Sequence, residues 1–337
     1  MYVDDLADLL TVDQAVEALE LATPTAVVLD SSIELEPFSD ESVALVVDGE
    51  RVPVSPEATL AFASKLGVPQ SYAKKLPVDF LIENMKFWLR QSNARLKAWV
   101  VDRGSQPYVA GIGGVDSMFL PPRSVMQVLA DVMTNAGGDV RVYTAHTSFT
   151  DVIFRLVNVT RGVEPVHDDL FFPGLSFSYS PTGTRATVIE GFNVRRVCTN
   201  GMLNTQAVER LRRSSTPEDP LDWIYEASMI VWMDTDAQFD RITAANTVII
   251  PRNHVGEVLT ELFEQYKIPA TLRPMILREA LEDDREQFTL LDLVNFITFV
   301  ASHDPDVSLA QQERLFRAAD VALQHQHICE TCYRPIV

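Results

Sequence analysis

Cysteine and long hydrophobic runs are both scarce in this 337-residue sequence. Three cysteines are too few for a disulfide framework, so we expect a protein that folds in a reducing cytoplasm. No apolar run approaches the roughly 18 residues that would span a bilayer, and the first residues are acidic where a secretory signal would be basic. The sequence therefore predicts neither export nor a membrane partner.

Basic residues are also in short supply, with 28 Lys and Arg against 47 Asp and Glu, which gives a net charge of −19. Such a charge argues at first against nucleic acid, because phosphate binding needs a positive field. The distribution is uneven, however: residues 1–69 carry −12, residues 70–213 carry +5 and residues 214–337 carry −12. The basic middle could form a face for an anion, or the acidic arms could be solvated helix faces.

A phosphate-binding loop of the Walker type is absent. The glycine pairs at 113–114 and 137–138 are not followed by the Gly-Lys-Ser/Thr start of a helix. A hydrophobic share of 47% and a charged share of 22% are those of an ordinary globular protein. We therefore expect an ordered chain without nucleotide hydrolysis of this kind.

The acidic first segment predicts small mixed elements. Thr11 and Gln14 have the spacing of a capping box, and Ser55 before Pro56 is typical of a second helix start. Residues 26–30 and 43–47 have the apolar, β-branched composition of short strands. Residues 1–69 are thus expected to form an α/β lead-in.

The middle segment predicts a sheet with flanking helices. Residues 79–92 place Leu81, Met85, Trp88 and Leu89 on one helical face, and a second helix is expected to begin at Ser124. Strands are predicted at 96–101, 108–112, 140–145, 152–157, 175–179 and 187–198, with a hairpin turn at 180–183.

The last segment predicts helices. Caps are expected at Thr216, Thr289 and Ser308, and residues 255–266 carry a continuous apolar stripe. The predicted fold class is α+β, with a central, mainly antiparallel sheet, flanking helices and a C-terminal helical lobe. The predicted segments are an acidic lead-in at 1–69, a basic sheet-containing core at 70–215 and an acidic helical lobe at 216–337.

Three stretches resemble a known family. They are residues 67–77 (GVPQSYAKKLP), residues 191–202 (GFNVRRVCTNGM) behind the turn at 180–183, and residues 290–303 (LLDLVNFITFVASH). Together they are similar to the phage/plasmid-like family called domain of unknown function 932, over about residues 60 to 320. The resemblance implies a protein of a phage or other mobile element that works in the cytoplasm of a bacterial host, and it supplies no catalytic residues.

Cys198 is the first candidate for chemistry. A cysteine nucleophile needs a nearby base and a lowered pKa; no histidine is close in sequence, and His146 and His167 could serve only if the fold brings them near. A cysteine in an apolar, alternating strand is more often a small buried hydrophobic residue, and we favour that interpretation. Asn200 and Gly201, which follow the strand, are expected to form a turn. No general base or open metal site can be assembled, so enzyme activity is not predicted.

The C-terminal run carries four side chains that can bind zinc, namely His325, His327, Cys329 and Cys332. Two cysteines separated by two residues can share one zinc ion, and an imidazole can add a third ligand. Structural zinc sites usually draw their ligands from two separated halves, so this half is incomplete by itself. An unliganded polar tail is the alternative interpretation.

The basic middle also places cations beside aromatic rings. Lys97 and Trp99 share one face of a predicted strand, and Arg141 and Tyr143 share a face of another. Single-stranded nucleic acid needs this combination, because bases stack on rings while cations hold phosphates. The alternative is that the rings are core and the charges solvated. The candidate nucleic-acid-binding residues are Lys86, Arg90, Arg95, Lys97, Trp99, Arg141, Tyr143, Arg185, Arg195 and Arg196.

Two classes of function stay open. The first is a non-enzymatic phage or mobile-element protein of DNA metabolism, a self-assembling factor that binds or anneals single-stranded DNA. The second is an assembly protein that binds a host or phage protein through the acidic helical lobe. A homo-oligomer is expected in either case, because the apolar helix faces of residues 216–325 need partners, which lie either within the chain or on another subunit.

Overall fold

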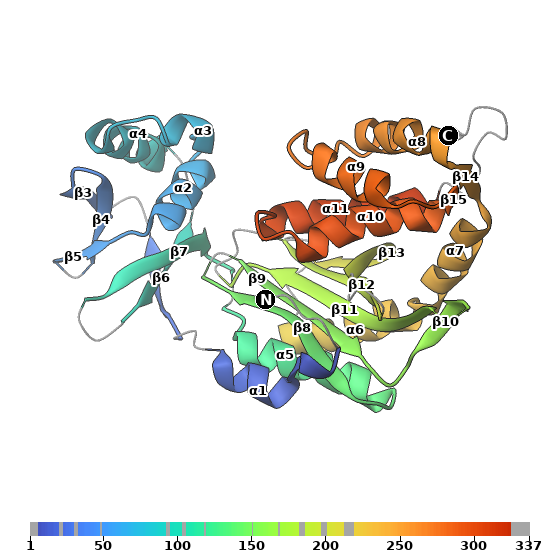
Figure 1. Ribbon diagram of the computed structural model, residues 1–337. Helices are drawn as coiled ribbons and strands as arrows, with labels where there is room; N and C mark the ends of the chain where they lie inside the picture. The colour runs from blue at the N-terminus through green and yellow to red at the C-terminus, as the bar shows by residue number, and fades with distance from the viewer. Residues whose placement is uncertain are drawn as a thin grey trace.

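The computed structural model has a small N-terminal lobe and a large lobe built on one wide sheet (Figure 1). It describes residues 6–19, 23–29, 33–47, 49–91, 95–102, 106–117, 119–149, 151–167, 169–181, 186–196, 201–211 and 219–324. The large antiparallel sheet, its flanking helices and a C-terminal helical region confirm the predicted fold class. In these described ranges, none of the helices combines the length and the apolar character needed to cross a membrane.

The small lobe contains two three-stranded sheets, with orders β2-β6-β7 and β3-β4-β5, and three helices. Its own hydrophobic core is centred on Phe62, Met85 and Ile112. Its elements are β2 (Thr25–Leu29), β3 (Glu34–Ser39), β4 (Ser42–Val47), β5 (Glu50–Pro53), α2 (Pro56–Lys65), α3 (Gln70–Ala73), α4 (Val78–Gln91), β6 (Leu96–Val101) and β7 (Tyr108–Gly114).

Helix α4 packs on the small lobe through one face. Its buried residues are Leu81, Ile82, Met85 and Leu89. The prediction that Trp88 lies on the same buried face is wrong, since its side chain is 44% exposed. Because Ile82 is buried as well, the buried face of α4 is centred away from Trp88. Trp88 therefore lies at the margin of that face.

The large sheet has seven strands, in the order β1-β8-β9-β11-β12-β13, with β10 paired to β11. Every pair of these named strands is antiparallel, and β11 and β12 pair on either side of the predicted hairpin turn. The strands are β1 (Leu10–Thr11), β8 (Val140–Thr147), β9 (Val152–Asn158), β10 (Val163–Val166), β11 (Asp169–Tyr179), β12 (Thr187–Arg195) and β13 (Gly201–Leu211).

Helices cover both faces of the large sheet (Figure 1). Three of them, α1 (Val12–Ala18), α5 (Pro122–Asn135) and α6 (Pro220–Met233), share a core with one face. The other face packs against the C-terminal helices α7 (Asp236–Thr247), α8 (Arg252–Gln265), α9 (Arg273–Glu282), α10 (Leu290–His303) and α11 (Leu309–Gln324). Three further short elements are the 3-10 helix Leu6–Asp8 and the paired strands β14 (Ile249–Pro251) and β15 (Gln287–Thr289).

Most of the predicted helix starts are confirmed. The side chains of Thr11, Ser55 and Thr289 accept hydrogen bonds from the backbone of the first turn of α1, α2 and α10. Ser308 and Gln311 exchange bonds at the start of α11. The start predicted at Ser124 is wrong, because α5 already begins at Pro122. A proline at the first helical position has no N–H that needs a partner.

Two other local predictions are changed by the structure. Helix α6 is capped by Asp219, whose carboxylate accepts from the backbone N–H of Leu221 at 2.8 Å, whereas Thr216 lies outside the described residues. Gly201 is the first residue of β13 and not part of a turn. A Cβ at Gly201 would lie 2.7 Å from the ring of Phe192, so this position requires glycine for close approach. Asn200 lies outside the described residues.

The interface between the sheet and α11 contains buried charges. Arg155 on β9 is 1% exposed and donates to Gln312 Oε1 at 2.5 Å, with its guanidinium over the rings of Phe192 and Phe316. Glu190 on β12 is 2% exposed. It accepts from Arg317 Nη2 at 2.5 Å, which makes a buried ion pair between the sheet and the helix.

A second buried polar network links α7 to the same helix. Gln238 donates to the carbonyl of Leu203 at 3.2 Å and to Asp320 at 2.7 Å, and it accepts from Asn193. Arg241 also donates to Asp320, at 3.4 Å. Most of these groups bond one another inside the core, while Arg155 Nε and Asn193 Oδ1 have no hydrogen-bond partner among the described residues, and we interpret both networks as structural.

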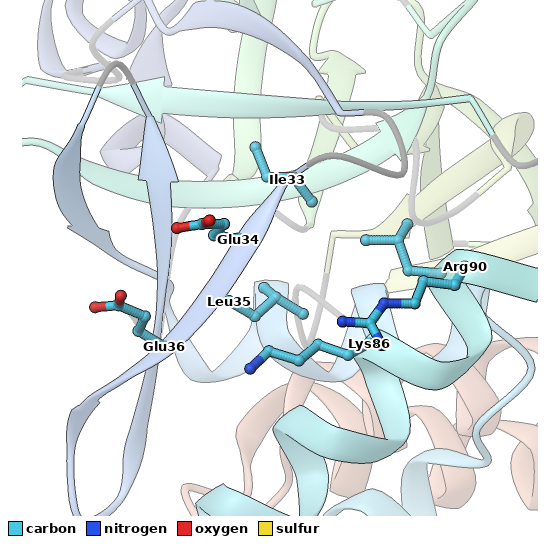
Figure 2. A pocket seen from close by; sticks show the side chains of 7 residues that line it. Ile33, Glu34, Leu35, Glu36, Lys86 and Arg90 are labelled. Carbon is cyan, nitrogen blue, oxygen red and sulfur yellow. The ribbon is translucent and has the colours of Figure 1, made fainter.

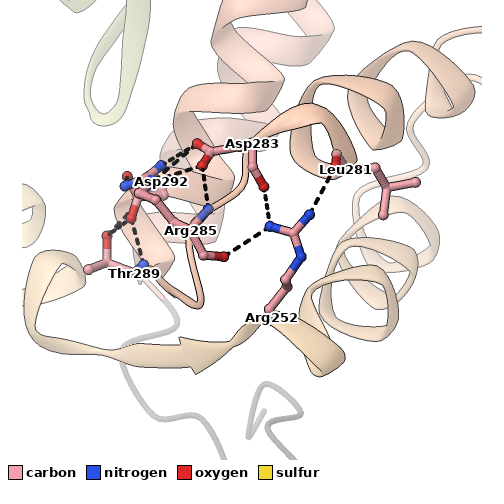
Figure 3. Close-up of polar contacts among 6 residues, drawn as sticks. All are labelled: Arg252, Leu281, Asp283, Arg285, Thr289 and Asp292. Atoms are coloured by element: carbon pink, nitrogen blue, oxygen red, sulfur yellow. Dashed lines mark hydrogen bonds and ion pairs between the residues drawn. The ribbon is translucent and has the colours of Figure 1, made fainter.

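Arg252 holds the chain between α9 and α10 (Figure 3). Its guanidinium donates to the backbone carbonyls of Leu281 (3.1 Å), Arg285 (3.0 Å) and Asp283. Arg285 in turn pairs with Asp283 and with Asp292, and its hydrogen bond holds the pKa of Asp283 below the usual value. One side chain therefore fixes a carbonyl of the last turn of α9 and two carbonyls of the irregular segment that follows it.

Replacing Arg252 with alanine should destabilise the protein by about 1–3 kcal/mol, because three carbonyls lose a charged donor. The change is measured as a shift of the urea midpoint followed by circular dichroism. Arg278 on α9 is the matched control, since it is exposed and bonds no carbonyl among the described residues, so Arg278→Ala should stay within about 0.5 kcal/mol. Equal effects of the two variants would contradict the assigned role.

The predicted boundaries at residues 69 and 215 mark changes of net charge along the chain. The hydrophobic cores are instead defined by which strands pair, and the two divisions do not coincide. Strand β2 of the acidic lead-in pairs with β6, and β1 pairs with β8, which are both in the predicted basic core. Helix α6 shares the core of α5 on the large sheet. The lead-in is therefore distributed over both lobes.

Candidate nucleic-acid interface

The predicted binding residues are distributed over two lobes. Five of them, Lys86, Arg90, Arg95, Lys97 and Trp99, lie in or beside α4 and β6 of the small lobe. On the large sheet lie Arg141 and Tyr143 in β8, and Arg195 and Arg196 at the end of β12. Arg185 lies outside the described residues. The structure thus does not gather these side chains on one face.

The small lobe exposes an unusual number of aromatic rings. Phe80, Phe87 and Trp88 on α4 are 65%, 56% and 44% exposed, and Tyr72 on α3 is also exposed. Phe80 and Phe87 are seven residues apart, two helical turns, so they share the outward face. The rings of Phe87 and Trp88 meet edge to face with centroids 5.3 Å apart. Exposed rings in such a group mark a binding surface more often than scattered surface residues do.

Cations surround this aromatic group. Lys74 and Lys75 are exposed in the turn between α3 and α4, and Arg90 is exposed near the end of α4. Lys86 is half-buried and pairs with Glu83 at 3.3 Å. Over residues 70–91 these four bases face only two acids, Asp79 and Glu83. We call the exposed rings and bases of residues 72–90 the α3–α4 surface.

A pocket of about 300 Å³ opens beside this surface, between α4 and β3. Lys86 and Arg90 extend toward it from the helix, and Glu34, Leu35 and Glu36 line it from the strand (Figure 2). Glu36 also pairs with Arg51 at 3.2 Å. The pocket is of mixed charge, so Lys86 and Arg90 lie at the border between this hollow and the outward rings of α4.

Lys97 and Trp99 share a face of β6 as predicted, but that face is covered. The lysine Nζ lies 5.3 Å from the centre of the indole and donates to the carbonyl of Ser117 at 3.0 Å. The Trp99 side chain is only 5% exposed and its ring packs near Phe119. Trp99 therefore cannot stack on a base in this conformation. Arg95, just before the strand, is exposed.

Arg141 and Tyr143 are also committed to other contacts. Arg141 donates to Asp139 at 2.6 Å. The ring of Tyr143 packs against Phe192 with centroids 5.1 Å apart, and burial raises the pKa of its hydroxyl despite a hydrogen bond with Ser302. The ring belongs to the core between β8 and α10. The predicted Arg141–Tyr143 pair is thus not an open stacking site.

Arg195 and Arg196 differ in their surroundings. Arg195 pairs with Asp169 at 2.8 Å, and Asp169 is itself buried. Arg196 is exposed next to it. Because helices cover both faces of the large sheet, these arginines lie at the end of a strand and not on an open sheet surface.

A cavity of about 580 Å³ lies between β8 and the loop that joins α10 to α11. Tyr143, His146, His303 and Asp304 line it together with apolar residues such as Val307. His146 was weighed as a base for Cys198, but Cys198 lies outside the described residues. Within the described chain the cavity holds no cysteine nucleophile.

The candidate zinc ligands His325, His327, Cys329 and Cys332 also lie outside the described residues, so zinc binding stays a prediction. In the part of the chain that the structure describes, no three His, Cys, Asp or Glu side chains come close enough to hold a metal ion.

Comparison with known proteins adds no relative. No protein-family model, curated protein or solved structure matches the chain. The resemblance to the phage/plasmid-like family therefore stays a prediction.

The residues of the α3–α4 surface that the sequence prediction did not include are Tyr72, Lys74, Lys75, Phe80, Phe87 and Trp88. The signal was present, because the two phenylalanines have helical spacing and lie opposite the apolar face of residues 78–91. Strand alternation, on which the predicted binding residues depend, carries no information about rings at helical spacing.

Proposed function

We propose that the protein is a non-enzymatic phage or mobile-element protein that binds single-stranded nucleic acid along the α3–α4 surface. The observation that carries the proposal is the group of exposed rings with neighbouring lysines and arginines. Bases of any sequence can stack on such rings, while the cations contact phosphates. The acidic remainder of the chain would repel the strand, which confines binding to this surface.

The chemistry of the surface favours single strands over duplex. Rings that are half exposed can accept an unstacked base, whereas bases inside a duplex are already stacked on one another. No feature of the surface reads base edges in a groove, so little sequence preference is expected. The mobile-element context that the family resemblance implies is consistent with such binding.

Salt dependence tests the electrostatic part of this proposal. Binding of a fluorescent polythymidine oligonucleotide is followed by anisotropy over a series of salt concentrations. Four cations, Lys74, Lys75, Lys86 and Arg90, should give a slope of log affinity against log salt of about −3, from roughly 0.7 per neutralised phosphate.

A matched pair of variants sharpens the measurement. Arg90→Gln should lower the slope by about 0.7, and Arg278→Gln, an exposed arginine on α9, should leave it unchanged. Absence of binding at low salt would reject the proposal, and equal effects of both variants would move the site away from α4.

A protein-interaction or assembly role is the second proposal. The outward face of α6 supports it, because three apolar side chains, Tyr225, Ile230 and Met233, are exposed there. A protein partner that co-purifies while the absorbance ratio shows no nucleic acid would favour this role.

A further inference from the structure

Helix α6 exposes large apolar side chains on the face that points away from the sheet. One face is buried against the large sheet through Ile224, Ala227 and Val231. On the other face Ile230 and Met233 are 54% and 74% exposed. Large apolar side chains grouped on an exposed face often mark a contact with another molecule, so this outward face is a candidate docking surface.

The charged side chains that α6 itself contributes are all acidic, although Arg161 of a neighbouring segment lies over the ring of Trp232 on this helix, 5.5 Å from its centre. Residues 219–234 contain four carboxylates and no lysine or arginine. These acids, Asp219, Asp222, Glu226 and Asp234, are all exposed. Asp222 and Glu226 fall on the same side of the helix as Tyr225 and Met233. Two such faces would repel each other, so the acidic α6 face requires a basic partner.

The same chain carries a surface of the opposite kind. The α3–α4 surface combines exposed rings with four bases, and it also has no partner element in the described structure. It lies on the small lobe, whereas α6 lies beneath the large sheet, and the two helices belong to different cores (Figure 1). The two surfaces therefore cannot cover each other within one molecule.

We propose that copies of this chain associate head to tail, with the α3–α4 surface of one copy docked on the outward face of α6 of the next. Aromatic side chains would supply the centre of the contact, and the lysines and arginines would face the carboxylates around α6. Two different surfaces meet in this contact, so the assembly is a ring or an open chain and not an isologous dimer.

The contact uses the surface that is proposed to bind nucleic acid, although its existence does not depend on that function. The outward face of α6 combines negative charge with apolar surface, as the phosphates and bases of a nucleic-acid strand do. Both can therefore contact the rings and cations of the α3–α4 surface. Added oligonucleotide should therefore compete with self-association if both proposals hold.

Mass measurement tests the association directly. The full-length chain, treated with nuclease and free of nucleic acid by its absorbance ratio, is analysed by sedimentation velocity over a range of concentrations. The expected result is a mass that rises with protein concentration and falls with added salt. A monomer at every concentration would overturn the proposal.

Variants locate the contact. Met233→Asp should weaken association by about tenfold or more, whereas Leu281→Asp, at an equally exposed apolar position on α9, should not. Both positions are exposed, so thermal unfolding should be unchanged. Association that survives Met233→Asp would overturn the assignment to α6.

Charge reversal identifies the two partners. The double variants Asp222→Lys/Glu226→Lys and Lys74→Glu/Lys75→Glu should each be impaired alone, and their mixture should associate, because reversed charges again face each other. Failure of the mixture to associate would overturn the pairing of α4 with α6. Met233→Asp should still bind oligonucleotide, so loss of self-association and loss of nucleic-acid binding are distinguishable.

Discussion

Replacing Arg317 with alanine is expected to destabilise the protein by about 3–5 kcal/mol, the largest effect on stability that we predict for a single residue. The variant would leave Glu190, which is 2% exposed on β12, as a charge without its main counterion. Burial lowers the pKa of Arg317 most, yet the attraction of Glu190 and Glu313 leaves that pKa above its ordinary value. The unfolding midpoint in urea measures the loss.

Two controls separate the ion pair from general damage to α11. Arg314 lies on the same helix and is exposed, so Arg314→Ala should change stability by no more than about 0.5 kcal/mol. The double variant Glu190→Gln/Arg317→Met removes both charges, and it should recover most of the stability that Arg317→Ala loses. A loss of less than about 1 kcal/mol in Arg317→Ala would show that Glu190 is solvated.

Removing the three rings of α4, in Phe80→Ala/Phe87→Ala/Trp88→Ala, should lower the affinity for single-stranded oligonucleotide by at least about a hundredfold. Each base stacked on a ring contributes roughly 1–3 kcal/mol, and the salt slope should change little because the cations remain. Anisotropy titrations at fixed low salt give the affinity.

The matched control for this variant is Phe38→Ala. Phe38 is an exposed aromatic residue of the same lobe, on β3, and its loss should not change the affinity. The three α4 rings are largely exposed, so thermal unfolding should be close to that of the unmodified chain. Retained affinity in the triple variant would contradict stacking on α4.

Local signals in the sequence predicted local structure well. The caps at Thr11, Ser55 and Thr289 depend on side chains that bond within one helical turn, so their spacing alone determines them. The hairpin between β11 and β12 is equally local. The fold class followed from the same kind of signal, because the spacing of apolar residues distinguishes a strand from an amphipathic helix within each segment.

The candidate site was less predictable, because alternation tells which residues share a face but not whether another element covers that face. Lys97 and Trp99 do share a face, yet Trp99 is buried in the small lobe. The burial of Arg155 and Glu190 could not be predicted for the same reason. They stand at strand positions that would be solvent-exposed in a two-layer fold, and a second layer of helices buries them.

The start of the chain has a consequence for any attempt to dissect the molecule. Helix α1 packs with α5 beneath the large sheet, and β2, a few residues later, is an edge strand of the small lobe against β6. Deleting the first thirty or so residues would therefore damage both lobes at once. A loss of binding in a truncation that begins after β2 would reflect a loss of folding and not of the binding surface. Point variants separate the two effects.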